Sequence, residues 1–153
     1  MRLLILSDSH GRRSYVFDAI DREPTADTVY FLGDGMNEVE EAAEIYGASK
    51  RFICVCGNCD RNSLALTRDI RTIGGKRIYA SHGFRENVKY GTYMLEDVAR
   101  ENKCDIALFG HTHVPCCEYR DGLYLFNPGS LFDGLYGVVD IVSNGVACVN
   151  KKL

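Results

Sequence analysis

Short apolar runs alternate with amphipathic stretches along the first third of the chain. The runs at residues 2–7, 28–32 and 51–56 are too continuously apolar for half-exposed strands, so we predict buried strands there. Between them, residues 13–22 and 37–46 carry apolar side chains at helical spacing, which predicts two helices. This β-α-β-α-β order indicates a parallel sheet with helices packed on it.

The pattern changes in the middle of the chain. Residues 68–73 and 76–81 form a predicted hairpin around Gly74 and Gly75, and a predicted helix at 91–101 follows. From this order we expect an α/β fold, a four-layer α-β-β-α sandwich of two mixed β-sheets flanked by helices. The remaining predicted strands are residues 105–109, 115–120, 123–127, 137–142 and 146–150.

The composition is that of a soluble globular protein, with 46% apolar and 25% charged residues. We expect one domain over residues 1–153, long enough to bury a substantial core. The net charge of -3 provides no global basic field for nucleic acid, and no apolar run approaches the ~20 residues of a membrane span. The N-terminal apolar run stops before Asp8 and does not resemble a secretory signal, so we expect a cytoplasmic protein.

The seven cysteines need a separate explanation. Their odd number, in a chain of this size, argues against a disulfide scaffold. Cys54 and Cys56 alternate along a predicted strand and are interpreted as small buried hydrophobic residues. Cys56 and Cys59 have the Cys-x-x-Cys spacing of thiol redox proteins and zinc sites, but no second such pair completes a four-cysteine zinc site.

Polar side chains follow five of the predicted strands, at the point where each strand ends. In a layered α/β fold, functional residues gather outside the carboxyl ends of the strands. His111 and His113 leave the strand at 105–109 with one residue between them, and alternation along a strand would send both into one space. The full set contains two carboxylates, four imidazoles and one amide: Asp8, His10, Asp34, Asn58, His82, His111 and His113.

Each of these residues also has a simpler explanation. Asp8 alone could cap a helix, and Asp34 and Asn58 beside glycines could be turn residues. His10 could belong to a loop, and His82 could be a surface residue or a satisfied core residue. Their joint occurrence at strand ends uses every histidine of the chain and favours a metal centre. Nitrogen and oxygen donors without thiolate suit two divalent ions of Mn, Fe, Ni, Co or Zn.

Five short motifs occur in a fixed order along the chain: Asp-x-His, Gly-Asp, Gly-Asn-x-Asp, a lone His and Gly-His-x-His. This order resembles the signature of the calcineurin-like metallophosphoesterases, over residues 1–130. It is most similar to the small prokaryotic phosphodiesterases of that superfamily, in which Gly-Asn-Cys-Asp and Asn-Pro-Gly-Ser also occur. The resemblance implies a dinuclear metal-dependent phosphoesterase, and more specifically a phosphodiesterase.

The resemblance also implies how the ligands divide between two divalent ions, for which Mn²⁺ is the first expectation. Asp34 would bridge both ions. The first ion would be held by Asp8, His10, Asp34 and His113, and the second by Asp34, Asn58, His82 and His111. The implied reaction is hydrolysis of a small phosphate ester by in-line attack of a metal-bridging hydroxide.

The candidate catalytic residues are Asn58, Cys59, Asp60 and His111. Many relatives carry a histidine in Gly-Asn-His as a proton donor to the leaving group, and this chain has Cys59 at that position. A thiol has a reference pKa of about 8.5 and donates only weak hydrogen bonds. We therefore expect inefficient hydrolysis of esters with poor leaving groups.

Two other classes of protein fit parts of the sequence. An interaction scaffold can share this fold, as the retromer subunit does with an incomplete ligand set, whereas the complete set here favours an enzyme. A thiol redox protein built on Cys56 and Cys59 would leave all four histidines unexplained. The sequence does not identify the substrate, and homo-oligomerisation is left open.

Overall fold

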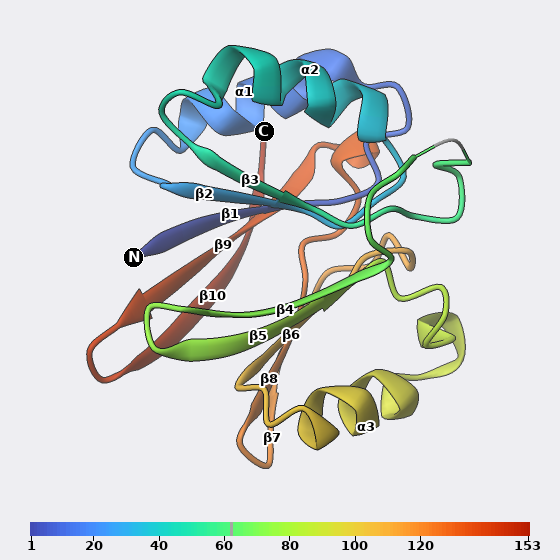
Figure 1. The fold of residues 1–153 in the computed structure, drawn as a ribbon, viewed down its shortest axis with the longest axis vertical. Helices are drawn as coiled ribbons and strands as arrows, with labels where there is room; N and C mark the ends of the chain where they lie inside the picture. The colour runs from blue at the N-terminus through green and yellow to red at the C-terminus, as the bar shows by residue number, and fades with distance from the viewer. Residues whose placement is uncertain (62) are drawn as a thin grey trace.

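The computed structural model describes residues 1–61 and 63–153, which form two five-stranded β-sheets packed face to face (Figure 1). In the first sheet, three parallel strands continue into an antiparallel hairpin, in the order β10-β9-β1-β2-β3. These strands are β1 (Arg2–Leu6), β2 (Thr28–Phe31), β3 (Arg51–Cys54), β9 (Leu135–Val142) and β10 (Gly145–Lys152).

The second sheet has the order β4-β5-β6-β8-β7. Its three central strands are parallel, and the strand at each edge is antiparallel to its neighbour. The strands are β4 (Arg68–Ile73), β5 (Lys76–Ser81), β6 (Ile106–Leu108), β7 (Cys116–Arg120) and β8 (Leu123–Asn127).

Helices cover the outer faces of both sheets (Figure 1). The helices α1 (Arg13–Arg22) and α2 (Met36–Tyr46) pack on the first sheet, and α3 (Tyr93–Glu101) packs on the second. Two mixed sheets flanked by helices confirm the predicted four-layer arrangement. Among the described residues, no helix is long and apolar enough to cross a membrane.

The continuous apolar run of β1 is explained by burial on both faces. Leu3 and Ile5 point into the core between the two sheets, whereas Leu4 and Leu6 point into the core beneath α1 and α2. All four side chains are fully buried. Because burial of one such side chain stabilises the fold by about 1.5–3 kcal/mol, this strand anchors the whole sheet.

Several element boundaries differ from the predicted ones. The helix α1 and the hairpin strands β4 and β5 have the predicted bounds, but β3 ends at Cys54 rather than at residue 56, and Val55 forms an isolated bridge to Leu66. The closing hairpin is longer than predicted, because Lys151 and Lys152 pair with β9 although their side chains have no apolar signal. The pairing is made by the backbone, which a search for apolar residues does not detect.

Candidate metal centre

The predicted ligands meet at one edge of the molecule, outside the carboxyl ends of five strands. Asp8 follows β1, Asp34 follows β2 and Asn58 follows β3 in the first sheet. In the second sheet, His82 follows β5 and His111 follows β6. Strands from both sheets therefore contribute to one site. The site consists of two adjacent clusters of side chains.

The first cluster contains Asp8, His10 and His113. The Oδ1 atom of Asp8 lies 3.1 Å from Nε2 of His113 and 3.7 Å from Nε2 of His10. The two Nε2 atoms are 3.3 Å apart. Asp8 is fully buried while both histidines are accessible, so this cluster opens toward solvent.

The second cluster converges on Nε2 of His82. This nitrogen lies 3.1 Å from Nδ1 of His111, 3.2 Å from Oδ1 of Asn58 and 3.4 Å from Oδ2 of Asp34. The same Oδ2 atom of Asp34 is 4.0 Å from Nε2 of His10. Asp34 therefore lies between the two clusters.

A hydrogen bond fixes the orientation of the His82 ring. Its Nδ1 atom lies 2.7 Å from the carbonyl oxygen of Leu32, which can only accept, so Nδ1 is the donor. In the neutral ring, Nε2 then carries a lone pair that points toward Asn58, His111 and Asp34. A backbone carbonyl that fixes the tautomer in this way is typical of metal-binding histidines.

The donor atoms fit divalent metal ions. With metal–nitrogen bonds of about 2.0–2.1 Å, neighbouring donors around one ion are roughly 3.0–3.4 Å apart, close to most distances in both clusters. The Oδ1 atom of Asp8 is buried without a hydrogen-bond partner among the described residues, although Nε2 of His113 is near. A buried carboxylate oxygen without a partner is costly, and a shared cation would satisfy it.

The charges of the site depend on each other. Burial alone would raise the pKa of Asp34, but the hydrogen bond and charge of His82, with the amide of Cys59, lower it well below its usual range. Burial alone would lower the pKa of His82, but Asp34 and Asp8 raise it overall. Burial, followed by the charge of His82, lowers the pKa of His111. The site thus keeps an ionised carboxylate at its centre.

Five of the seven predicted ligands adopt a left-handed backbone conformation. The φ angles are 56° for Asp8, 42° for His10, 60° for Asp34, 67° for His111 and 60° for His113. Such conformations cost about 1–3 kcal/mol each in residues other than glycine and cluster at functional sites. Alternation along a strand does not explain the positions of His111 and His113, because β6 ends at Leu108. Each of these two histidines turns toward a different cluster.

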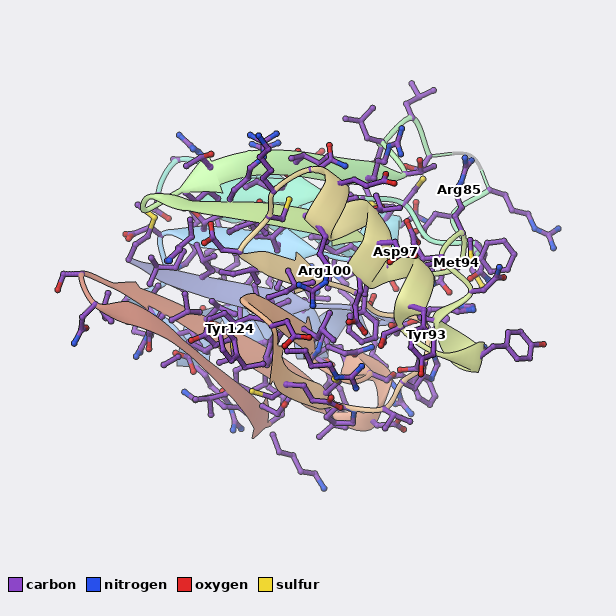
Figure 2. All side chains as sticks on the ribbon, turned by 90° about the horizontal axis from the view of Figure 1, so that it is seen from below. Arg85, Tyr93, Met94, Asp97, Arg100 and Tyr124 are labelled. Carbon is purple, nitrogen blue, oxygen red and sulfur yellow. The ribbon has the colours of Figure 1, made fainter. Side chains whose placement is uncertain are left out.

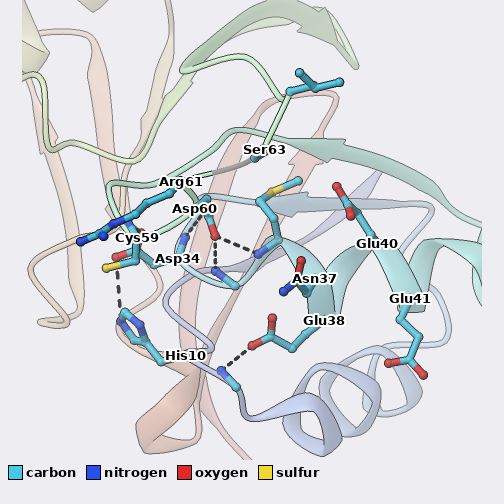
Figure 3. A pocket seen from close by; sticks show the side chains of 14 residues that line it. His10, Asp34, Asn37, Glu38, Glu40, Glu41, Cys59, Asp60, Arg61 and Ser63 are labelled. Atoms are coloured by element: carbon cyan, nitrogen blue, oxygen red, sulfur yellow. Dashed lines mark hydrogen bonds and ion pairs between the residues drawn. The ribbon is translucent and has the colours of Figure 1, made fainter.

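Asp60 links the loop that carries Asp34 to the loop that carries Asn58 through hydrogen bonds (Figure 3). Its Oδ2 atom accepts hydrogen bonds from the amides of Asp34 and Gly57, at 2.7 and 2.8 Å. Its Oδ1 atom accepts from the amides of Gly35 and Met36, at 2.9 and 3.0 Å, and so supplies the side-chain cap that Gly35 does not provide at the start of α2. We interpret Asp60 as a positioning residue, whereas the sequence had placed it among the catalytic candidates.

Two glycines allow the loops to approach the carboxylates closely. A Cβ atom on Gly57 would lie 2.1 Å from Oδ1 of Asp34, and one on Gly110 would lie 2.0 Å from Oγ of Ser7 and 2.9 Å from Oδ2 of Asp8. A larger residue would displace the carboxylate of Asp34 at the first position, and at the second the hydroxyl of Ser7, which donates a hydrogen bond to Asp8. This contact explains why glycine precedes Asn58 and His111 in the two motifs.

Sequence reasoning missed the function of Asn127. This fully buried side chain donates to the carbonyl of Gly110 at 2.9 Å and to Oγ1 of Thr112 at 3.1 Å, and it accepts from the amide of Gly129 at 2.8 Å. Ser130 donates to the carbonyl of Asp8 at 3.1 Å. The Asn-Pro-Gly-Ser motif at residues 127–130 was the sequence signal that could have indicated this function. Its polar residues hold the loops that carry the ligands.

Two cavities adjoin the centre, and both include Asp60 and Arg61 in their lining. One has a volume of about 800 Å³ and is lined by His10, Asp34, Cys59 and the start of α2 (Figure 3). The other has a volume of about 410 Å³ and includes Asn58, His82, Phe84 and Arg85 in its lining. Phe84 packs edge-to-face on His111, with the ring centroids 5.4 Å apart.

Comparisons with known proteins indicate the same family as the motifs do. The family model of the calcineurin-like phosphoesterase superfamily domain matches residues 1–143. YsnB of Bacillus subtilis, a probable metallophosphoesterase, is 30% identical over 132 residues, which cover 86% of this chain and 75% of that protein. The phosphodiesterase YfcE of Escherichia coli is 27% identical over 153 residues, with 86% of this chain and 79% of that protein covered.

Solved structures share the fold at lower sequence identity. A Streptococcus pneumoniae protein predicted to be a phosphoesterase has a TM-score of 0.77 at 22% identity, with 98% of this chain and 97% of that chain covered. Vps29 of Entamoeba histolytica in complex with Zn²⁺ has a TM-score of 0.75 at 22% identity, with 99% of both chains covered. These two likenesses concern the fold alone. The match to the family model, over nearly the whole chain, confirms the resemblance seen in the motifs: this protein belongs to the calcineurin-like phosphoesterase superfamily.

Proposed function

We propose that this protein is a dinuclear metal-dependent phosphodiesterase. The observation that carries the proposal is the convergence of seven nitrogen and oxygen donors in two clusters, with Asp34 between them. The names of the relatives, a probable metallophosphoesterase and a phosphodiesterase, support the same class of reaction. The substrate is a small phosphate ester.

The proposed ligands divide as the motifs imply. Asp8, His10 and His113 would hold the first ion, Asn58, His82 and His111 the second, and Asp34 both. The donor set contains imidazole, carboxylate and amide groups, which suit Mn²⁺, with Fe²⁺, Co²⁺, Ni²⁺ and Zn²⁺ as the other members of the class. When bound, two such ions would lower the pKa of a water and neutralise charge on the phosphoryl group.

The protein's own groups orient this centre. The carbonyl of Leu32 fixes the tautomer of His82, and Asp60 holds the loops of Asp34 and Asn58 at a constant separation. These contacts join groups of the protein itself, so they would orient the ligands without help from a substrate and limit reorganisation during the reaction. The side chains therefore present a preformed site to an anionic ester.

The two cavities favour a diester over a monoester. A phosphodiester carries two substituents, and the 800 Å³ and 410 Å³ cavities, which share Asp60 and Arg61 in their lining, would each take one of them. The larger cavity is lined by Cys59, whose thiol donates only weak hydrogen bonds. Cys59 is then a poor acid toward a leaving group, which favours esters whose leaving group departs without a proton.

A panel of phosphomonoesters and phosphodiesters tests the proposal. The purified protein is assayed with Mn²⁺, Mg²⁺ or Zn²⁺, and after exhaustive chelation. We expect hydrolysis of an activated aryl diester that disappears on chelation and returns with Mn²⁺. Unchanged turnover in protein with confirmed metal loss, or no turnover with any ion, would contradict the proposed function.

A further inference from the structure

A third group of donor atoms adjoins the two clusters. The ligand atoms of His10, Asp34 and Cys59 all lie within 4.8 Å of one another. Figure 3 shows the three side chains together at the wall of the larger cavity, with Cys59 beside Asp34 and His10 below them. This group differs from the other two in containing sulfur, and it shares one residue with each of them.

The backbone holds Cys59 in place at this wall. Its amide donates to Oδ1 of Asp34 at 2.8 Å, and the side-chain amide of Asn58 donates to its sulfur at 3.3 Å. The residue is exposed and lines the 800 Å³ cavity, so an ion can reach the sulfur from solvent. The sulfur is thus both fixed near His10 and open to the outside.

We propose that His10, Asp34 and Cys59 form an additional position for a thiophilic divalent cation such as Zn²⁺ or Cd²⁺. Thiolate sulfur is a soft ligand and selects such ions, whereas Mn²⁺ and Mg²⁺ prefer oxygen and nitrogen. The sulfur releases its proton to solvent when it binds the ion, and no electron is transferred. The proposal rests on the proposed metal centre, with which it shares His10 and Asp34.

The sharing has a functional consequence. An ion bound to Cys59 uses the imidazole of His10 and the carboxylate of Asp34, which the other two clusters also need. A thiophilic ion at this position therefore competes with Mn²⁺ for those donors and blocks the open side of the centre. The centre becomes sensitive to excess Zn²⁺ or Cd²⁺ through one residue.

The chain provides a matched control. All seven cysteines are free, and Cys117 is exposed like Cys59. The sulfur of Cys117 donates to the carbonyl of Cys148 at 3.4 Å, on β7, which forms an edge of the second sheet. Among the described residues, Cys59 is the one cysteine found in a group of three candidate metal-binding side chains. Cys117→Ser thus removes an exposed thiol without affecting the proposed position.

The test is a Cd²⁺ titration of the Mn²⁺-loaded protein, followed by the ultraviolet charge-transfer absorption of a cadmium–thiolate bond. We expect the band in the wild type and in Cys117→Ser, and its loss in Cys59→Ser and Cys59→Ala. Even partners outside the ligand shell change metal affinity ~10–100-fold, so loss of the sulfur should weaken Cd²⁺ binding at least about tenfold. An equal band and equal affinity in folded Cys59→Ser would overturn the proposal.

Inhibition gives a second readout. Excess Zn²⁺ should reduce the Mn²⁺-dependent turnover of the wild type, and Cys59→Ser should need at least about tenfold more Zn²⁺ for the same fractional loss. The two proposals can fail separately. A Cd²⁺ band without phosphodiesterase activity would refute the proposed function alone, whereas Mn²⁺-dependent activity without a band would refute the third cation position alone.

Discussion

Asp60→Asn tests how the loops that carry the ligands are held. The wild-type carboxylate accepts four amide hydrogen bonds, two on each oxygen. Asparagine keeps the shape but replaces one oxygen with an NH₂ group, which faces two amide donors and can accept from neither. The substitution therefore removes two hydrogen bonds to a charged acceptor and introduces a donor–donor conflict.

The expected loss of stability follows from these contacts. A hydrogen bond to a charged group contributes about 1.5–3 kcal/mol, so two would contribute about 3–6 kcal/mol. Asp60 is half-buried, and water can compensate some of the loss, so we expect the free energy of unfolding to fall by about 2–4 kcal/mol. Because the same contacts position Asp34 and Asn58, Mn²⁺ affinity should also fall ~10–100-fold.

Urea unfolding and calorimetric Mn²⁺ titration measure the two effects. Asp97→Asn is the matched control, because Asp97 is exposed on α3 (Figure 2) and lies outside the centre. Its stability should change by less than about 0.5 kcal/mol. If Asp60→Asn matches this control in both stability and Mn²⁺ affinity, the positioning function assigned to Asp60 is wrong.

Three further predictions address the ligands, the leaving group and pH. Asp34→Ala should retain less metal than His113→Ala, because Asp34 would bridge both ions; equal, full occupancy would count against the bridge. Cys59→His should flatten the dependence of kcat/KM on leaving-group pKa and raise alkyl-ester turnover, by ~10²-fold if general acid catalysis is gained; identical slopes in two folded, metallated proteins would exclude this. Arg2 donates to Asp140 at 2.9 and 2.8 Å, and this hydrogen bond lowers the pKa of Asp140. The ion pair therefore stabilises the fold above the ordinary carboxyl pKa, and this stabilisation is lost as pH falls through the lowered pKa of Asp140. Asp140→Asn should lower the free energy of unfolding by about 0.5–1 kcal/mol at pH 7 and by progressively less below about pH 4. A loss that stays constant over this pH range in urea unfolding would contradict the assignment.

Apolar periodicity predicted most of the fold because most strands are buried on both faces. The hairpin of β4 and β5 had the strongest local signal, since Gly74 and Gly75 separate two strand-like runs. The C-terminal end of β10 was not predicted, because its last residues are lysines that pair through the backbone. Local residue patterns predict an element well when the side chains determine it, and poorly when only the backbone does.

The ligand set was predicted from strand ends, but its geometry was not. His111 and His113 lie in different clusters, and both have positive φ angles, which no local pattern encodes for histidine. The function of Asp60 depends on two loops that are adjacent only in the folded sheet, since it reaches amides 24 to 26 residues away. The cysteine at position 59 could be recognised as a departure from relatives, whereas its proximity to His10 required the structure.

Phosphodiester hydrolysis by this protein should need two metal ions per chain. The most direct test is to titrate metal-free protein with Mn²⁺ while measuring bound metal and turnover of an aryl phosphodiester on the same samples. We predict two bound ions per chain, maximal turnover only at full occupancy, and a melting temperature that rises with metal by mass action. Full turnover with one ion or none bound would contradict the dinuclear centre.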